Sequence, residues 1–403
     1  MKILVSHPGK QHAHQLIQGL SEKFNVVFVT SYWFQPASLL YSLMQKLLFP
    51  GKSFLLRQLY KRYHKPIENI RIIEKPIPEF IRLLCLAVIK PRDFEKFVFI
   101  RDRNFDHNAA LVVLKQKPGV VVGYEMACLE TFKAAKKNGA ITVLDLAQIH
   151  YNEIEAIASR FPTFGRLFRE ERLRKKINEI KEAELCLADY ILCLSDFAEE
   201  SLIKNGVLRN KIFKVNLGFN PETFKAKDIY SENGKFRFVF AGTLTKRKGI
   251  DLLIQAFEDL NLYDSELLLI GPITDARELI PKNNTRIKHI DYVSHKELNL
   301  LLNQSDVFVF PSYLDSWAMV VVEAMACGLP VVVSINTGAS DVVRQGGGYV
   351  IHPEIITLRG VMKYFYDNRK EVERLGREAR KIAEQYTWEK YHKQVREAFQ
   401  KMV

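Results

Sequence analysis

The chain has 403 residues, of which 47% are hydrophobic and 26% charged, and its formal net charge is +13. This length is long for one hydrophobic core, so two domains are expected, and the composition lets both fold without metals or disulfides. The five cysteines are odd in number and lack metal-type spacing, which favours reduced thiols and excludes a disulfide framework. No apolar run reaches the roughly 18 residues of a membrane span, and MKILVSHPGK predicts a strand rather than a signal peptide. We therefore expect a cytoplasmic protein.

The positive charge is concentrated in one segment. From Lys23 to Lys65 there are seven Lys and Arg residues and no Asp or Glu. Basic, aromatic and leucine residues alternate in YSLMQKLLFPGKSFLLRQLYKRYHK, which fits a surface lying on anionic lipid headgroups at the inner face of the plasma membrane. It fits equally a helix pair whose apolar residues face the core. No nucleic-acid motif accompanies the charge, so a nucleic-acid partner is not expected.

Short apolar runs alternate with longer helical patterns, which is typical of a parallel sheet covered on both faces. The first half predicts strands at ILVS (3–6), NVVFVT (25–30), KFVFI (96–100), GVVVGY (119–124), ITVLDL (141–146), YILCLS (190–195) and KIFKVNLG (211–218).

The pattern restarts after a polar, turn-rich segment between Asn216 and Lys235, where we place the hinge. Two successive arrays of this kind predict an α/β protein with two doubly wound domains. The charged pattern from Arg369 to Val403 carries an apolar stripe typical of a packing face. The second half predicts strands at KFRFVFAG (235–242), SELLLIG (265–271), TRIKHIDYV (285–293), DVFVFPS (306–312) and LPVVVS (329–334), and helices at 249–260, 294–304 and 320–328.

The chemistry is concentrated in PSYLDSWAMVVVEAMACGLPVVVS, residues 311–334. A strand ends at Pro311, a loop carries Asp315, and a helix begins near Trp317 with Glu323 inside it. The N–H groups of such a helix start suit a phosphate, while carboxylates on either side suit sugar hydroxyls. The pattern therefore indicates a nucleotide sugar. In the alternative interpretation, Asp315 caps the helix and Glu323 is solvated. Apolar neighbours on both sides of Glu323 favour a buried carboxylate that needs a partner.

This segment resembles the nucleotide-sugar signature of the family-four group of retaining glycosyltransferases. Its second half, Glu323-Ala-Met-Ala-Cys-Gly-Leu-Pro-Val-Val, follows the family pattern closely. In its first half Asp315 replaces a glutamate and Ser316-Trp317-Ala318 replaces Gly-Phe-Gly. The segment FVFAGTLTKRKGIDLLIQAF resembles the family's diphosphate-binding segment, with Lys248 and Gly249 matched. Thr243 stands where the family has an arginine, and Arg247 is expected to supply that charge.

The resemblance implies a GT-B fold in which two Rossmann-like domains face each other across a cleft. Residues 1–216 would then bind the acceptor, with the last helix (385–403) packing back on them, and residues 217–384 would bind the donor. It also implies transfer with retention, with no metal or cofactor, in which cations stabilise the departing diphosphate. The expected catalytic residues are His150, Arg247, Lys248 and Asp315. The expected donor contacts are Gly9, Gly242, Thr243, Arg247, Lys248, Gly271, Tyr292, Asp315, Ser316, Trp317, Ala318, Met319 and Glu323.

The first half carries weaker signals. In HPGKQHAHQL, His7, His12 and His14 allow a metal site, but a loop-helix cap with His12 facing the cleft is favoured. His150 follows a strand at the edge where open α/β sheets bind ligands, and the family has a sugar-binding histidine at a comparable place. A surface histidine is the alternative. Glu125, after GVVVGY, is a further acceptor-side candidate beside His12.

The expected partners are a UDP- or GDP-sugar donor and a glycan or lipid-linked acceptor, as in bacterial surface-polysaccharide biosynthesis. Two other functions fit the same scaffold. One is a nucleotide-sugar epimerase or hydrolase, which needs acid and base carboxylates such as Glu125, Asp145 or Glu153. The other is a non-catalytic partner in carbohydrate assembly.

Overall fold

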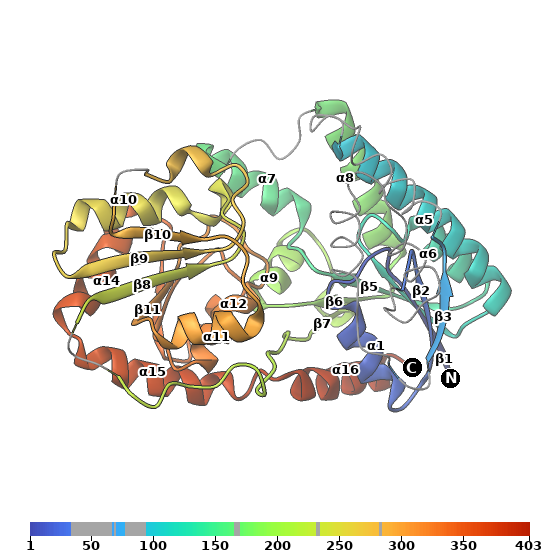
Figure 1. Cartoon of the computed structure of the whole chain (residues 1–403). Coiled ribbons are helices and arrows are strands. Elements are labelled where there is room, and N and C mark those ends of the chain that lie inside the picture. Colours follow the sequence, from blue (N-terminus) through green and yellow to red (C-terminus); the bar gives the residue numbers. More distant parts are fainter. Residues whose placement is uncertain (34–66, 68–69, 77–93, 165–169, 231–233, 282–283) are drawn as a thin grey trace, which may run out of the picture.

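The computed structural model of the chain describes residues 1–33, 67, 70–76, 94–164, 170–230, 234–281 and 284–403. These residues form two sheets, of seven and six strands, that lie side by side with helices packed on them (Figure 1). Every pair of neighbouring strands in the described residues is parallel. The predicted α/β class with two doubly wound halves is confirmed. The domain boundary at 216/217 stays a prediction.

The first sheet has the strand order β3-β2-β1-β4-β5-β6-β7. The inner strand β1 is buried on both faces: Ile3 and Val5 belong to the core that includes α1, and Leu4 belongs to the core under α5 and α6. That double burial explains why the strands are continuous apolar runs. The elements are β1 (Lys2–Ser6), α1 (Ala13–Ser21), β2 (Asn25–Thr30), β3 (Ile70–Glu74), α5 (Phe94–Gln116), β4 (Val120–Tyr124), α6 (Leu129–Lys137), β5 (Ile141–Leu146), α7 (Tyr151–Arg160), α8 (Glu171–Leu187), β6 (Tyr190–Cys193), α9 (Asp196–Lys204) and β7 (Ile212–Lys214).

The second sheet has the order β10-β9-β8-β11-β12-β13, again with the first strand of the half inside the sheet. The strand order reverses between β8 and β11, and ligands of doubly wound sheets bind at the carboxyl ends beside such a reversal. The elements are β8 (Phe236–Ala241), the 3-10 turn η4 (Lys246–Lys248), α10 (Ile250–Leu260), β9 (Ser265–Ile270), β10 (Ile287–Ile290), α11 (His295–Asn303), β11 (Val307–Phe310), α12 (Met319–Ala326), β12 (Val331–Ser334), α13 (Ser340–Val343), β13 (Gly348–Ile351), α14 (Ile355–Asp367), α15 (Lys370–Ala383) and α16 (Trp388–Met402).

One predicted strand is wrong. KFVFI (96–100) lies in the first turns of the helix α5. A short apolar run does not distinguish a strand from a helix segment. The run continues at helical spacing into the buried residues Phe105, Ala109 and Val113, so burial along one helix face decides the structure.

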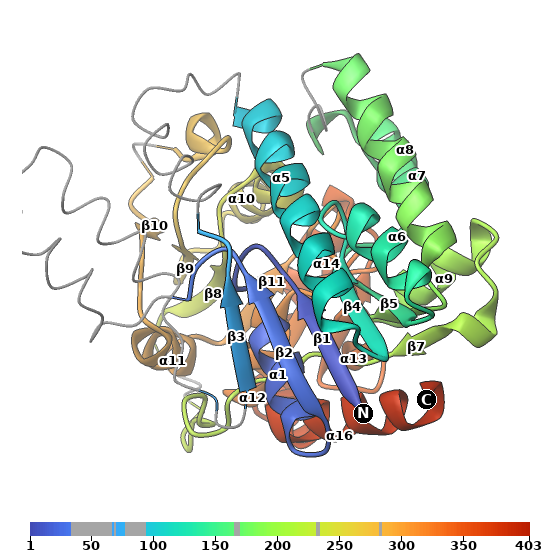
Figure 2. The same cartoon turned by 90° about the vertical axis from the view of Figure 1, so that its right-hand side faces the viewer.

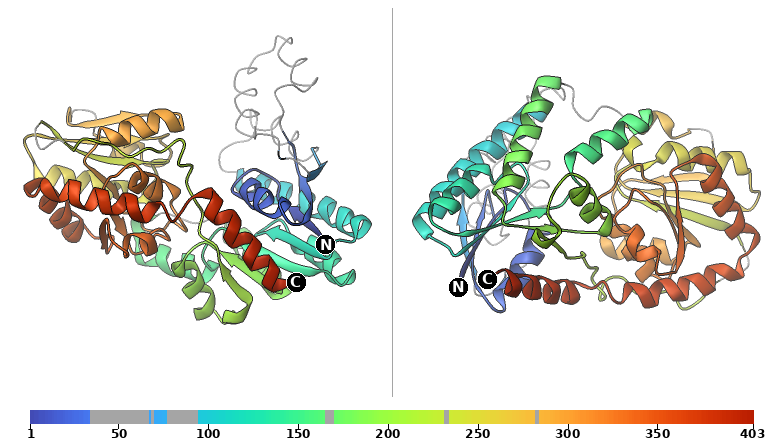
Figure 3. Two further views of the ribbon diagram at one scale, coloured as in Figure 1. Left: turned by 90° about the horizontal axis from the view of Figure 1, so that it is seen from below. Right: turned by 180° about the vertical axis from the view of Figure 1, so that it is seen from behind.

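The last two helices run from the second half to the first (Figures 1 and 3), and Figure 2 shows α16 near α1 with the two chain ends close together. The single charged pattern after Arg369 divides into α15, which packs on α12, and α16, which packs on α1 of the first half. Thr387 separates them and caps α16 by accepting a hydrogen bond from the Lys390 N–H. A Cβ at Gly19 would lie 3.0 Å from the His392 Cα, so α1 and α16 approach closely because residue 19 has no side chain. The chain thus ends near its own first strand.

In the part of the chain that the structure describes, no helix is both long and apolar enough to cross a membrane. The basic segment from Lys46 to Lys65 lies outside the described residues.

Candidate active site

The loop between β11 and α12 holds Asp315 firmly. Its N–H donates to the Asn336 carbonyl at 3.0 Å, and its carbonyl accepts from the Gly338 N–H at 2.9 Å. One carboxylate oxygen accepts from the Trp317 N–H at 3.3 Å. Asp315 therefore organises the turn and does not cap α12, whose N-cap is Ala318 without a side-chain hydrogen bond.

Ala318 is strained. Its φ of 61° and ψ of 68° lie in the left-handed region that L-residues with a Cβ disfavour. Ala318 stands where the family's Gly-Phe-Gly turn has its second glycine. The alanine therefore adds a Cβ while the backbone keeps a left-handed conformation that glycine adopts readily. Trp317 is buried and its indole N–H has no hydrogen-bond partner in the described residues. The turn is thus fixed by packing and by Asp315.

The turn leads directly into α12. No described group accepts a hydrogen bond from the backbone N–H of Met319 or Val320, the first two residues of the helix. Free N–H groups and the positive end of the helix dipole together favour an anion at this place.

Glu323 lies inside α12 and is 6% exposed. Burial raises the pKa of its carboxyl from 4.5 to about 7. None of the described residues donates a hydrogen bond to its side chain. The interpretation of Glu323 as a solvated residue is therefore wrong, and its carboxylate is a buried acceptor that suits a hydroxyl-bearing ligand.

Two cations lie beside the Asp315 loop. The Lys248 ammonium is 3.8 Å from an Asp315 carboxylate oxygen and lies over the Phe310 ring, 5.4 Å from its centroid. Burial lowers the pKa of Lys248, and Asp315 partly opposes that shift. The Arg247 guanidinium donates to the Leu314 carbonyl at 2.6 Å, so both cations are directed to the carboxyl ends of β8 and β11.

Gly242 makes room for Lys248, and Gly271 makes room for the backbone of Gly242. A Cβ at Gly242, whose φ is +139°, would lie 2.9 Å from the Lys248 ammonium nitrogen. Gly271, with φ +130°, would bring a Cβ to 2.1 Å from the Gly242 carbonyl oxygen. Thr243 is half-buried in the same loop. Tyr292 is different, because it is 80% exposed on the loop after β10 and contacts none of these groups.

On the opposite side, the carboxyl ends of β1, β4 and β5 carry a buried polar cluster. His12 Nε2 lies 2.9 Å from both carboxylate oxygens of Asp145. Burial lowers the pKa of His7 to about 4, and its Nδ1 accepts from the Gly9 N–H at 2.8 Å, so His7 is a neutral ring protonated at Nε2. Tyr124 packs edge-on against His7, with ring centroids 4.4 Å apart.

Gln148 joins the two halves and was missed by the sequence analysis. Its side-chain oxygen accepts from the Ser316 hydroxyl at 2.9 Å. It also lines two cavities, one of about 300 Å³ over the His12–Asp145 pair and one of about 380 Å³ beside Arg247 and Leu314. Glu125 lines both cavities and pairs with Lys181 at 2.8 Å. The donor-side residues predicted in the second half and the acceptor-side residues predicted in the first half therefore meet at Gln148.

His150 lies apart from this junction. It is the N-cap of α7, where Nδ1 accepts from the Asn152 N–H at 3.2 Å, and its ring stacks on Tyr151. Burial lowers its pKa. No described contact joins it to Asp315, Lys248 or Arg247, and the side chain at this strand end that reaches the second half is Gln148.

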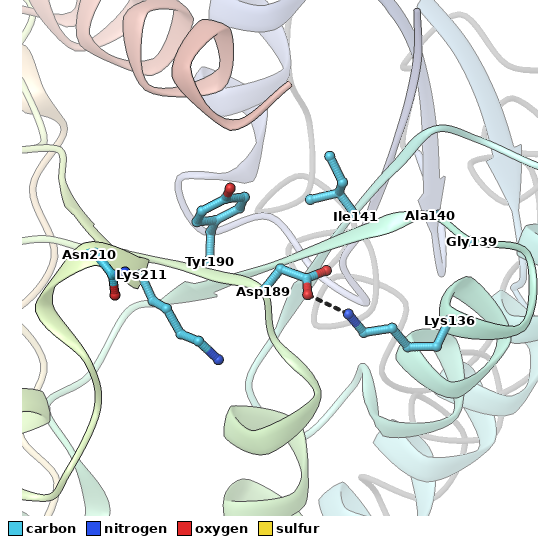
Figure 4. A pocket seen from close by; sticks show the side chains of 8 residues that line it. All are labelled: Lys136, Gly139, Ala140, Ile141, Asp189, Tyr190, Asn210 and Lys211. Atoms are coloured by element: carbon cyan, nitrogen blue, oxygen red, sulfur yellow. Dashed lines mark hydrogen bonds and ion pairs between the residues drawn. The ribbon is translucent and has the colours of Figure 1, made fainter.

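A third hollow, of about 620 Å³, lies at the amino ends of β5 and β6 (Figure 4). Lys136 pairs there with Asp189 at 2.6 Å, and Tyr190 and Lys211 lie nearby. Because it lies at the opposite edge of the sheet, it contains none of the predicted site residues. No group of three or more His, Cys, Asp or Glu side chains within the described ranges is arranged to hold a metal ion.

Residues 222–382 match the family model described as Glycosyl transferases group 1. An uncharacterized glycosyltransferase of Methanocaldococcus jannaschii is 26% identical over 224 residues, which cover 53% of this chain and 60% of that protein. The capsular polysaccharide biosynthesis glycosyltransferase CapM of Staphylococcus aureus is 28% identical over 42% of this chain and 50% of its own length. The chain thus spans about half the length of the curated relatives that it matches.

Two solved structures resemble the whole chain. The sucrose-phosphate synthase of Thermosynechococcus elongatus has a TM-score of 0.71 at 16% identity, covering 100% of this chain and 99% of its own. Anabaena HepE in complex with UDP has a TM-score of 0.65 at 14% identity, covering 100% of both chains. At such identities the likeness shows the fold alone.

Proposed function

We propose that the chain transfers a sugar from a nucleotide-sugar donor, because residues 222–382 match the group 1 glycosyltransferase model and the two sheets form a GT-B fold. The expected GT-B fold is confirmed. The match over residues 222–382 supports a group 1 glycosyltransferase, while the family-four assignment and the reaction are our proposal. The observation that carries it is Glu323, a buried carboxylate to which no described residue donates a hydrogen bond. It lies in a helix whose first N–H groups have no acceptor among the described residues. A nucleoside ribose offers hydroxyls to such a carboxylate, and a diphosphate accepts from such N–H groups.

The cations complete the donor site in this proposal. Lys248 is held between Asp315 and the Phe310 ring, and Arg247 follows the same turn. Held in place before the donor binds, they would stabilise the negative charge that develops on the departing diphosphate. Asp315 would then accept from a hydroxyl of the transferred sugar with the oxygen that faces Lys248.

Retention of the anomeric configuration and independence of metal belong to the proposal as well. The cations and the α12 N-terminus supply positive charge of the kind that a divalent ion gives to a diphosphate. Transfer should therefore survive EDTA. Complete loss of activity that Mg²⁺ or Mn²⁺ restores would overturn this part.

The acceptor is proposed to be a glycan or a lipid-linked glycan of a bacterial surface polysaccharide. The name of CapM and the basic composition of Lys46–Lys65 support this class. We propose a cytoplasmic protein that binds the inner face of the plasma membrane peripherally. It should sediment with anionic liposomes at low salt, and failure to do so would remove the membrane part.

Incubation with radiolabelled UDP- and GDP-sugars tests the proposal against its two alternatives. A transferase releases the nucleoside diphosphate slowly when the donor is the only substrate, and faster when an acceptor is added. An epimerase or hydrolase converts the donor without any acceptor, and a non-catalytic partner converts nothing. A donor that neither binds nor reacts would refute the proposed function.

A further inference from the structure

The end of helix α7 brings residues of the first half onto a turn of the second half. Figures 1 and 3 show α7 running from the first sheet toward the second. Phe161 is the C-cap of α7, and the 3-10 turn η2 (Pro162–Phe164) follows it. This turn packs against η4 (Lys246–Lys248), which carries the two cations of the candidate site. The first half therefore contacts the cation turn directly.

We propose that Phe161 and Tyr313 are positioning residues that fix Arg247 for a bound diphosphate, so that the first half completes the anion site of the second. The inference rests on the proposed function and adds two residues to its donor site. Both residues act through Arg247, and neither is proposed to touch the nucleotide.

The first argument is that Arg247 is held at both of its ends. Its backbone carbonyl accepts hydrogen bonds from the Tyr313 N–H at 2.9 Å and from the Ser312 hydroxyl at 3.2 Å. Its guanidinium donates to the Leu314 carbonyl at 2.6 Å. Residues 312–314 thus fix both the backbone and the charged group of Arg247. A shift of these residues would move the guanidinium with them.

The second argument is that residues 312–314 depend on the first half for their packing. Tyr313 and Leu314 are 4% and 2% exposed, and together with Phe164 they belong to the core under α5 and α6. The ring of Phe161 packs on the ring of Tyr313, with centroids 4.9 Å apart and planes 32° apart. Aromatic pairs at this separation stabilise each other beyond the area that they bury. The aromatic pair therefore links the position of Arg247 to the first half.

The third argument is that the Tyr313 ring is also anchored in the second half. Its hydroxyl donates to the Asp251 carboxylate in α10 at 2.7 Å. Burial and this hydrogen bond raise the pKa of the phenol, so the hydroxyl stays protonated and remains a donor. The ring is thus held between Asp251 of the second half and Phe161 of the first. Fixing a cation in this way before the ligand binds favours binding of the diphosphate charge.

A positioning role and a purely structural role predict different couplings. If the aromatic pair only stabilised the fold, losing the Phe161 ring would weaken nucleotide binding to the same extent with or without the Arg247 guanidinium. If Phe161 acts through Arg247, losing the ring matters only while that guanidinium is present. A double-mutant cycle distinguishes the two roles.

The test measures the affinity of the full chain for UDP by isothermal titration calorimetry, in a cycle of Phe161→Leu and Arg247→Met. Leucine keeps an apolar side chain at this half-buried position and removes the aromatic ring. We expect Arg247→Met to weaken UDP binding roughly tenfold and Phe161→Leu roughly fivefold. In the Arg247→Met background, Phe161→Leu should change the affinity by less than about twofold.

Tyr313→Phe tests the second anchor, because it keeps the ring and removes the hydrogen bond to Asp251. It should weaken UDP binding roughly threefold in the wild type and leave it unchanged in the Arg247→Met background. Phe213→Leu is the matched control. Phe213 is a half-buried ring on the edge strand β7, and it packs edge-on against Tyr190 with centroids 5.6 Å apart. Its replacement should leave UDP affinity unchanged, and urea unfolding checks that every variant is folded.

Three results would overturn the inference: Phe161→Leu with the affinity of the wild type, an equal loss in both backgrounds, or Arg247→Met with unchanged affinity. If UDP does not bind the wild type and no donor reacts, the proposed function fails and this inference fails with it. If UDP binds and a donor reacts while the effects of Phe161→Leu and Arg247→Met are additive, only the positioning inference fails.

Discussion

Replacing Glu323 by Gln should stabilise the ligand-free protein at alkaline pH and have little effect on its stability below pH 4.5. Burial raises the pKa of Glu323 from 4.5 to about 7. The neutral carboxyl therefore makes its full contribution to the free energy of unfolding below pH 4.5. That contribution is lost as pH rises through about 7, where the folded carboxyl ionises. At about 1.4 kcal/mol per pKa unit, ionisation of the folded protein costs about 3 kcal/mol, which a neutral amide avoids.

Urea unfolding at pH 5 and pH 8 measures this difference. We expect Glu323→Gln to be more stable than the wild type by about 0.8 kcal/mol at pH 5 and by about 3 kcal/mol at pH 8, because the unfolded carboxyl is already partly ionised at pH 5. Glu200→Gln is the control, because Glu200 is an exposed residue of α9 whose removal should change neither value.

Nucleotide binding should respond in the opposite direction. A hydrogen bond to a charged group contributes about 1.5–3 kcal/mol, so Glu323→Gln should weaken UDP binding roughly 10- to 100-fold. The stabilised variant would therefore be the poorer binder. A variant that is less stable than the wild type at pH 8, or that binds UDP as well, would refute the account of Glu323.

Three further changes test neighbouring parts of the site. Ala318→Gly should raise the unfolding free energy by about 1 kcal/mol, because glycine removes the left-handed strain; an unchanged urea midpoint would contradict this. Gly271→Ala should destabilise the chain by more than about 1 kcal/mol in the same assay, since its Cβ would lie 2.1 Å from the Gly242 carbonyl. Lys248→Met should lower the transfer rate roughly 100- to 1,000-fold, and a rate within threefold of wild type would exclude Lys248 from charge stabilisation.

Local patterns account for what the sequence predicts well. One continuous segment contains the strand that ends before Pro311, the turn at Asp315 and the buried Glu323. Their spacing along the sequence therefore predicts how they lie relative to one another. The glycine-type backbone at Ala318 could not be predicted in this way, because alanine gives no local sign of a positive φ.

The contacts of the first half are ones that local sequence patterns do not predict. The His12–Asp145 pair joins residues 133 positions apart, and the Ser316–Gln148 hydrogen bond spans 168 positions. Such pairs depend on how the sheets are assembled, which hydrophobic periodicity does not specify. The sequence placed His150 at the correct sheet edge but did not show that Gln148, two residues earlier, reaches the second half.

A crystal structure of the chain with UDP bound tests the central claim most directly. We expect ribose hydroxyls on the Glu323 carboxylate and phosphate oxygens on Lys248 and on the N–H groups of Met319 and Val320. UDP bound elsewhere, or bound with Glu323 still without a partner, would contradict it.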